Sequence, residues 1–198
     1  MASKLTPELI GALSTATVGI GSLALSYIKW ILPWIRKNRE EADKQQLIDG
    51  LSRLRIAFVT MESLLQIPGV GRVILFAAHN SGGVPKIGSP FYTSAIHWAV
   101  STAPRESLAD YRMIPLDGHY TKLLHELQEQ DSKVIVTTDL PPCILKDYYE
   151  AEQVSSALLV FVGIREARFL YVSISKFKGA LFEKPEITRI IRRVRQIR

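Results

Sequence analysis

The sequence predicts an α+β domain, an antiparallel sheet with flanking helices, behind one transmembrane helix and a long juxtamembrane helix. Three observations predict this arrangement. An uncharged run of twenty residues lies near the N-terminus, a long amphipathic helical pattern follows it, and the remaining chain mixes apolar strand patterns with short helices. We expect a transmembrane anchor over 1–36, a juxtamembrane helix over 37–68 and a globular domain over 69–198 that ends in a basic amphipathic helix.

The composition suits a folded protein whose positive charge is concentrated in two places. Of the 198 residues, 47% are hydrophobic and 22% are charged, which provides enough apolar material for a core. The net charge of +6 comes from the region after the uncharged run and from residues 184–198, while residues 61–183 carry 11 basic and 13 acidic side chains. We therefore expect no general affinity for polyanions in the middle of the chain. The single cysteine, Cys143, excludes an internal disulfide and a cysteine-based zinc site.

The uncharged run, residues 9–28, reads LIGALSTATVGIGSLALSYI. As a helix it would be about 30 Å long, which matches the hydrocarbon core of a bilayer. Trp30 and Trp34 follow it, where interfacial aromatic residues belong, and Pro33 bends or ends the helix. We expect a single-span anchor. A buried soluble helix and a signal peptide are the alternatives, and the long run preceded only by Lys4 disfavours the signal peptide.

Basic residues beside this run set its orientation. Lys29, Arg36, Lys37 and Arg39 follow it, and only Lys4 precedes it. The positive-inside rule then places the C-terminal domain in the cytoplasm, or inside the particle if the protein belongs to a virion. We expect Arg36, Lys37 and Arg39 to contact lipid phosphates. Small residues, which either allow two such helices to pair or are simply common in such spans, recur on one face at Gly11, Thr15, Gly19, Ser22 and Ser26.

A long helix is predicted from Asn38, which suits an N-cap, to Pro68 and Gly69, which end it. Its apolar residues are spaced four and three apart, as in a coiled-coil seam, at Leu47, Leu51, Leu54, Phe58, Met61 and Leu65. Two interpretations of this short seam stay open here. It is either a stripe that faces the core of the domain or the contact surface of a parallel dimer.

The elements of the globular domain are predicted from apolar runs bounded by turn residues. Strands are expected over 72–78, 93–101, 111–115, 133–138, 156–164 and 168–177. Helices are expected over 118–130, 144–153 and 186–197. The last two strands are joined by the short segment REA as a tight hairpin. This order favours an antiparallel sheet with the helices on one face.

The order of these elements resembles a GAF domain, a relative of the PAS fold. The resemblance covers residues 40–198 and rests on a long leading helix, a first strand near RVILFAAHN, a variable middle, the closing hairpin SALLVFVGIREARFLYVSIS and a final helix. The first strand with its His-Asn-x-Gly-Gly end is also similar to GAF-like proteins from bacteriophages and bacteria. The resemblance implies a GAF-like sheet with flanking helices. The signature of cyclic-nucleotide binding and a cysteine placed for a bilin are both missing, so no cofactor is implied.

Two sets of residues are candidate ligand contacts. The first set ends the first strand, where glycines allow backbone amides to approach an anion: His79, Asn80, Gly82 and Gly83. The alternative for this segment is a structured turn with a hydrogen-bonded histidine. The second set falls where the resemblance places a ligand pocket, and its members are either pocket wall or core: Tyr92, His97 and Tyr111.

The spacing of the polar residues indicates neither a metal site nor catalysis. The four histidines lack the three- or four-residue helical spacing of a ligand pair, and no carboxylate motif accompanies them. A Gly-x-Ser-x-Gly elbow is absent, and no serine, histidine and aspartate are selected as a set by their spacing. We expect no metal ion, no catalytic residue and no enzymatic activity.

The chain closes with a basic amphipathic helix, ITRIIRRVRQIR. Its isoleucines and valine fall on one face and its arginines on the rest, so we expect the apolar face to pack inward. The arginines would then face lipid headgroups. Nucleic acid is the rival partner, and it would be bound in a strongly salt-dependent way. The expected phosphate contacts are Arg189, Arg192, Arg193 and Arg195.

These observations lead to two functional hypotheses. The first is a membrane-anchored, non-enzymatic sensory or interaction module that binds a partner or small ligand and self-associates as a homo-oligomer through its transmembrane and juxtamembrane helices. The second is a bacteriophage structural or membrane-acting protein, a minor virion or membrane component, that uses the GAF-like fold as a scaffold. A sensory module predicts a specific ligand. A structural role predicts high-order assembly that disappears when residues 1–35 are deleted.

Overall fold

A computed structural model describes residues 32–80, 89–101 and 111–197. The chain divides into two units between Ser52 and Arg53. The predicted anchor over 9–28 lies outside the described residues, as do Gly82 and Gly83 of the predicted glycine-rich turn. Among the helices that are described, none is both long and apolar enough to cross a bilayer. The anchor, and the orientation inferred from its flanks, therefore stay predictions.

The predicted juxtamembrane helix is α2 (Leu32–Leu64), which begins in the first unit and ends in the second. Side chains one turn apart support it locally, as in the ion pair between Arg36 Nε and Glu40 Oε1 at 3.3 Å. All side chains from 36 to 56 are exposed. The helix stops before Pro68, which cannot continue it because proline lacks an amide hydrogen.

The apolar seam of α2 is buried only at its end. Met61 is fully buried and Leu65 is half-buried. The four seam residues before them are exposed, Leu47 by 63%, Leu51 by 57%, Leu54 by 39% and Phe58 by 42%. Within the unit Arg53–Arg198, the interpretation of the seam as a core-facing stripe is wrong at Leu54 and Phe58, because α2 packs into the core only from Ala57 onward and these two side chains stay exposed.

In the part of the chain that the structure describes, six antiparallel strands form one sheet in the order β3-β2-β1-β6-β5-β4. Their bounds are β1 Val70–His79, β2 Tyr92–Val100, β3 Ile114–Pro115, β4 Ser132–Val136, β5 Val154–Arg165 and β6 Arg168–Phe177. Each expected strand is present, although the third is only two residues long. β5 and β6 form the predicted hairpin, in which Glu166 and Ala167 have φ angles of 50° and 59°. Positive φ at both central residues matches the twist of a two-residue hairpin.

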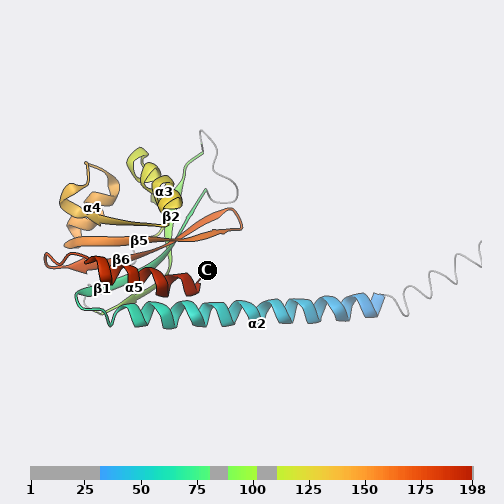
Figure 1. The fold of residues 1–198 in the computed structure, drawn as a ribbon. Helices are drawn as coiled ribbons and strands as arrows, with labels where there is room; N and C mark the ends of the chain where they lie inside the picture. Colours follow the sequence, from blue (N-terminus) through green and yellow to red (C-terminus); the bar gives the residue numbers. More distant parts are fainter. Residues whose placement is uncertain (1–31, 81–88, 102–110, 198) are drawn as a thin grey trace, which may run out of the picture. The chain divides into compact units, whose positions relative to one another are not determined.

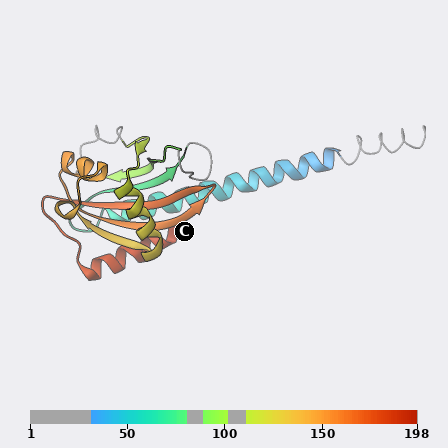
Figure 2. The same cartoon turned by 90° about the horizontal axis from the view of Figure 1, so that it is seen from above.

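Helices cover both faces of the sheet (Figures 1 and 2). α3 (Gly118–Gln130) and α4 (Ile144–Ala151) pack on one side, here called the α3/α4 face. α5 (Lys184–Val194) and the end of α2 pack on the other, the α2/α5 face. The expectation of helices on one face is therefore wrong. The physical reason is that VILFAA in β1 and ALLVFV in β5 are continuous apolar runs, which are typical of strands buried on both sides.

Candidate ligand pocket

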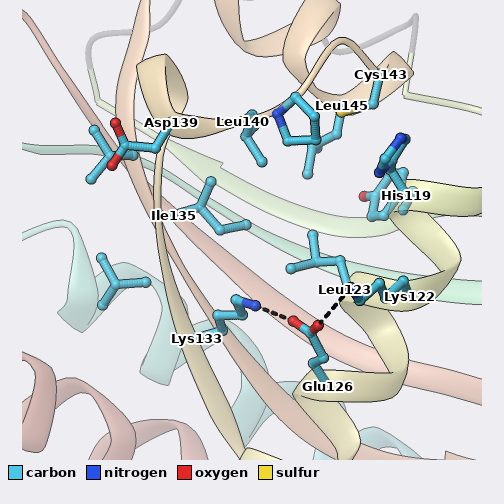
Figure 3. Close-up of a pocket in the computed structure, with 14 residues that line it drawn as sticks. His119, Lys122, Leu123, Glu126, Lys133, Ile135, Asp139, Leu140, Cys143 and Leu145 are labelled. Atoms are coloured by element: carbon cyan, nitrogen blue, oxygen red, sulfur yellow. Dashed lines mark hydrogen bonds and ion pairs between the residues drawn. The ribbon is translucent and has the colours of Figure 1, made fainter.

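A pocket opens on the α3/α4 face, between α3 and the edge strand β4 (Figure 3). Its volume is about 310 Å³. The short 3₁₀-helix Thr137–Asp139 and the start of α4 close it at one end. This volume lies at the lower end of the range for small-molecule sites.

Local chain geometry creates this pocket. α3 ends at Gln130, and the next residue, Asp131, has a left-handed backbone with a φ of 64° that lets the chain reverse directly into β4. At the other end of α3, Asp117 Oδ1 accepts a hydrogen bond from the Tyr120 amide at 2.7 Å, and its Oδ2 accepts one from the Ile144 amide at 2.8 Å. One carboxylate therefore caps α3 and also holds the first residue of α4. Asp117 thereby holds the start of α3 close to the start of α4, beside the pocket.

The floor of the pocket is apolar. Leu123 of α3, Ile135 of β4 and Leu145 of α4 are buried in the core cluster on this face, and Leu140 packs against them. Removing apolar surface from water is favourable by about 25 cal/mol per Å². The floor therefore favours an apolar group on whatever fills the pocket.

Charged side chains lie along the rim (Figure 3). Lys133 of β4 donates a hydrogen bond to Glu126 of α3 and forms an ion pair with it, while Lys122 Nζ lies 3.9 Å from Glu126 Oε1. The hydrogen bond from Lys133 is the main reason why the pKa of Glu126 is lowered. Two lysines thus share one carboxylate, which leaves an excess of positive charge at this end. His119, Asp139 and Cys143 line the rest of the pocket.

A small chamber and a group of buried, hydrogen-bonded tyrosines lie behind the pocket. Tyr120 and Leu145 line both the pocket and a chamber of about 10 Å³. The hydroxyl oxygen of Tyr120 is 2.7 Å from that of Tyr171, which is itself 3.0 Å from Thr93 Oγ1. Burial raises the pKa of Tyr120 well above its ordinary value and that of Tyr149 to about 12. At physiological pH these tyrosines are therefore neutral hydrogen-bonding groups.

An ion pair is buried beside this chamber. Arg72 of β1 is 1% exposed and donates from Nη1 to Glu152 Oε2, which also accepts a hydrogen bond from the Tyr111 hydroxyl at 2.6 Å. The guanidinium carbon lies 5.0 Å from the ring centre of Tyr111 and 5.6 Å from that of Phe177. Since Glu152 follows the last residue of α4, the pair ties β1 to the helix whose start closes the pocket.

The fold of this domain resembles solved structures. No family model and no curated protein sequence matches the chain. Solved structures do match it. The GAF domain/HD domain protein of Geobacter sulfurreducens aligns with a TM-score of 0.53 and 12% identity over 72% of this chain and 87% of that one. A red/green cyanobacteriochrome gives 0.54 and 16% over 73% and 90%, and a far-red cyanobacteriochrome photoreceptor gives 0.53 and 13% over 84% and 94%. The fold is GAF-like.

His79 and Asn80, the described members of the predicted set at the end of β1, are not among the residues that line the pocket between α3 and β4. His79 Nε2 is 3.1 Å from Ser94 Oγ, which also accepts a hydrogen bond from the Met113 amide at 3.0 Å. Tyr92 is paired with His79 across β1 and β2, and Asn80 follows His79 at the strand end. This geometry supports the alternative interpretation, a structured strand end with a hydrogen-bonded histidine.

His97 and Tyr111 lie on opposite faces of the GAF-like sheet. The His97 ring contacts Phe58 of α2, with ring centres 4.8 Å apart, and burial lowers the pKa of His97. Tyr111 packs in the core of the α3/α4 face, against Phe76 and Tyr148. The structure therefore does not bring the described members of the predicted ligand set together. Of its described members, Tyr111 lines the chamber behind the pocket.

The charged pair of the pocket was missed by the sequence analysis. Glu126 and Lys133 are seven residues apart, one on a helix and one on the following strand. They meet because Asp131 reverses the chain between them, and no periodic pattern links positions on two different elements. The available signal was the helical spacing of Leu123 and Leu127, which identifies the face of α3 that packs inward.

The predicted phosphate contacts are divided between solvent and protein partners. Arg193 donates a hydrogen bond from Nη1 to the Ser63 carbonyl at 2.8 Å, so it caps the C-terminal end of α2. Arg195 lies 3.6 Å from Asp131. Every member of the set except Arg193 is exposed, namely Arg36, Lys37, Arg39, Arg189, Arg192 and Arg195. The apolar side of α5 packs inward, as its pattern predicts, through Ile190 and Val194.

Proposed function

We propose that the chain is a membrane-anchored, non-enzymatic sensory or interaction module whose GAF-like domain binds a ligand between α3 and β4. The observation that carries this proposal is the pocket of about 310 Å³, with its apolar floor and a few charged groups at the rim. That combination is typical of a binding site. One of the matched structures is a photoreceptor, which supports a sensory use of the fold.

The side chains around the pocket favour binding over catalysis. A general acid or base works best with a pKa near the operating pH. Glu126 is held by Lys133, and its lowered pKa makes it a weak base. Tyr120 lines both the pocket and the chamber behind it, and burial raises its pKa and keeps it protonated. These groups are suited to orienting a ligand.

Self-association is proposed through α2. Its exposed seam residues, Leu47, Leu51, Leu54 and Phe58, have the four- and three-residue spacing of a parallel helix pair. Exposed apolar residues in such a series are typical of a protein contact surface. The exposure supports the dimer interpretation of the seam over the core-facing one. The membrane anchor is proposed from the sequence alone, because residues 9–28 form an uncharged run long enough to span a bilayer.

The single cysteine of the chain lines the pocket and supplies a direct test. The full chain would be purified in a mild detergent and screened by thermal shift against a library of metabolites and fragments. Compounds that raise the melting temperature are then tested for slowing the reaction of Cys143 with a thiol reagent. We expect both effects from the same compound, because a filled pocket shields the thiol.

Two tryptophan variants make the test specific. Leu123→Trp places a large ring in the pocket and should abolish both effects. Ile164→Trp, at a residue of the β5–β6 hairpin that is 59% exposed, should leave them unchanged. The proposal fails if no compound slows Cys143 modification, or if Leu123→Trp binds as well as the unaltered chain. A bacteriophage structural role would instead give no ligand, and high-order assembly that is lost on deleting residues 1–35.

A further inference from the structure

β4 lies at one edge of the sheet. It pairs with β5 along its whole length, from Ser132 opposite Val160 to Val136 opposite Ser156. No strand among the described residues pairs with its outer side. An edge strand presents backbone donors and acceptors that a further extended segment can use.

The pocket runs along this strand. Four successive residues of β4, Lys133–Val136, line it, and α3 forms the opposite wall (Figure 3). Four residues of a strand span about 10 Å, so this wall of the pocket is long enough to border a short extended segment. A groove between an edge strand and a helix is the geometry in which a peptide adds to a sheet as a new strand.

The side chains along β4 determine which side chains of such a peptide would fit opposite them. Lys133 and Ile135 project toward the same side, since their partners Leu159 and Ala157 both belong to the core of the α3/α4 face. Ile135 is 4% exposed and forms part of the apolar floor. Lys133 stands two residues away, at the charged end. On an added strand, side chains opposite these two positions lie about 5 Å from them.

The charges around Lys133 determine which kind of peptide side chain fits opposite it. Lys133 and Lys122 both interact with the single carboxylate of Glu126. The side chain of Lys122 remains 76% exposed, so it can reorient toward an incoming anion. An acidic side chain opposite Lys133 would balance the excess positive charge, whereas a basic one would add to it.

We propose that the groove between α3 and β4 binds an extended peptide as an added strand, with an apolar residue over Ile135 and an acidic residue over Lys133. The two peptide residues are separated by one position, because side chains on one face of a strand alternate. This inference rests on the proposed function, since it names the ligand class of the same pocket.

The test uses the full chain in mild detergent and fluorescently labelled eight-residue peptides built on alternating Thr and Ser. One peptide carries Val-Thr-Glu at its centre and a second carries Glu-Thr-Val, because either strand direction satisfies the pattern. Binding is followed by fluorescence anisotropy and by protection of Cys143. We expect one of the two to bind, its Glu→Gln version to bind about fivefold more weakly, and a version N-methylated at alternate backbone positions not to bind.

Lys122→Glu gives a specificity test at a solvent-exposed position, so folding is not at risk. This variant should lose the preference for Glu over Gln and gain a preference for a Val-Thr-Lys or Lys-Thr-Val peptide. Lys184→Glu, an exposed residue at the start of α5, is the matched control and should behave like the unaltered chain.

Strand addition is wrong if the N-methylated peptide binds as well as its parent, or if Lys122→Glu leaves the peptide preference unchanged. If no peptide binds while a small molecule still protects Cys143, the peptide inference fails and the proposed ligand pocket stands. If neither peptides nor small molecules protect Cys143, both proposals fail.

Discussion

The carboxylate of Asp117, in front of α3, accepts a hydrogen bond from the amide of Ile144, the first residue of α4, at 2.8 Å. The same carboxylate caps α3 through the Tyr120 amide. Two helices that are separated in sequence by β4 therefore share one acceptor. Their common hydrogen-bond acceptor lies beside the pocket, where α3 forms one wall and the start of α4 closes one end.

Asp117→Ala should lower the free energy of unfolding by about 2 kcal/mol, because it removes one helix cap and one further hydrogen bond. Asp117→Asn keeps one carbonyl oxygen and should lose about half as much. Urea denaturation of the full chain in detergent measures both values. Equal stability of the alanine variant and the unaltered chain would show that the shared cap is unimportant.

The buried pair of Arg72 and Glu152 predicts a non-additive pair of mutations. Arg72→Met leaves the carboxylate buried without its partner and should cost about 3 to 5 kcal/mol. Adding Glu152→Gln removes the orphaned charge and should recover part of this loss. A double-mutant cycle from denaturation curves gives the coupling. Additive losses would mean that the two side chains do not stabilise each other.

The buried tyrosines predict a loss of stability at alkaline pH. Burial raises the pKa of Tyr149 to about 12, while the unfolded chain titrates near 10. Between these values the folded state holds a proton that the unfolded state has released, so the free energy of unfolding falls as pH rises. The contribution of one such tyrosine amounts to about 2 to 3 kcal/mol across this window.

Tyr149→Phe should therefore flatten the pH dependence between pH 10 and 12, and an exposed-residue variant such as Thr188→Ala should not. Denaturation curves collected at several pH values give the slopes. A Tyr149→Phe variant with the same slope as the unaltered chain would contradict the assigned cause.

The exposed seam of α2 predicts a change in oligomeric state. Replacing Leu47 and Leu51 together by Glu places charges where two helices would pair, and the full chain in detergent should shift toward the monomer. Sedimentation velocity measures the shift. Gln46→Glu adds a charge beside the seam and should leave assembly unchanged. An oligomer that survives the Leu47→Glu and Leu51→Glu double change would exclude this surface as the contact.

Replacing His79 separates the two candidate ligand sites. His79→Ala removes the hydrogen bond to Ser94 and should cost about 1 kcal/mol of stability. It should not change the affinity of any ligand that protects Cys143, because His79 lies outside the pocket lining. Thermal shift and thiol protection measured on one sample give both numbers. Loss of binding in this variant would move the site to the end of β1.

The order of elements was predictable because local patterns decide it. The predicted helix over 118–130 has the bounds of α3, and the short segment after Ile164 forms the expected hairpin turn. Each depends on residues close in sequence: an Asp cap, apolar residues at helical spacing, or two apolar strands around a tight turn. The GAF-like resemblance rests on the order of these locally predicted elements along the whole domain.

The layers and the pocket depend on contacts between distant residues, and these were not predictable. Arg72 and Glu152 are 80 residues apart, and nothing in the sequence around either indicates the other. The α2/α5 face was missed because a continuous apolar strand does not show which helix will cover its second side. The positions of α2 and α5 are settled by contacts such as that between Arg193 and Ser63.

Burial of the sheet on both faces gives the domain a graded resistance to local opening. The amides at the centres of β1, β5 and β6 lie between two layers of helices and have a strand on each side. They should exchange with deuterated solvent only when the domain unfolds globally. β4 lies at an edge of the sheet, so its amides need only a local opening, and the border of the groove would take up deuterium before the centre of the sheet.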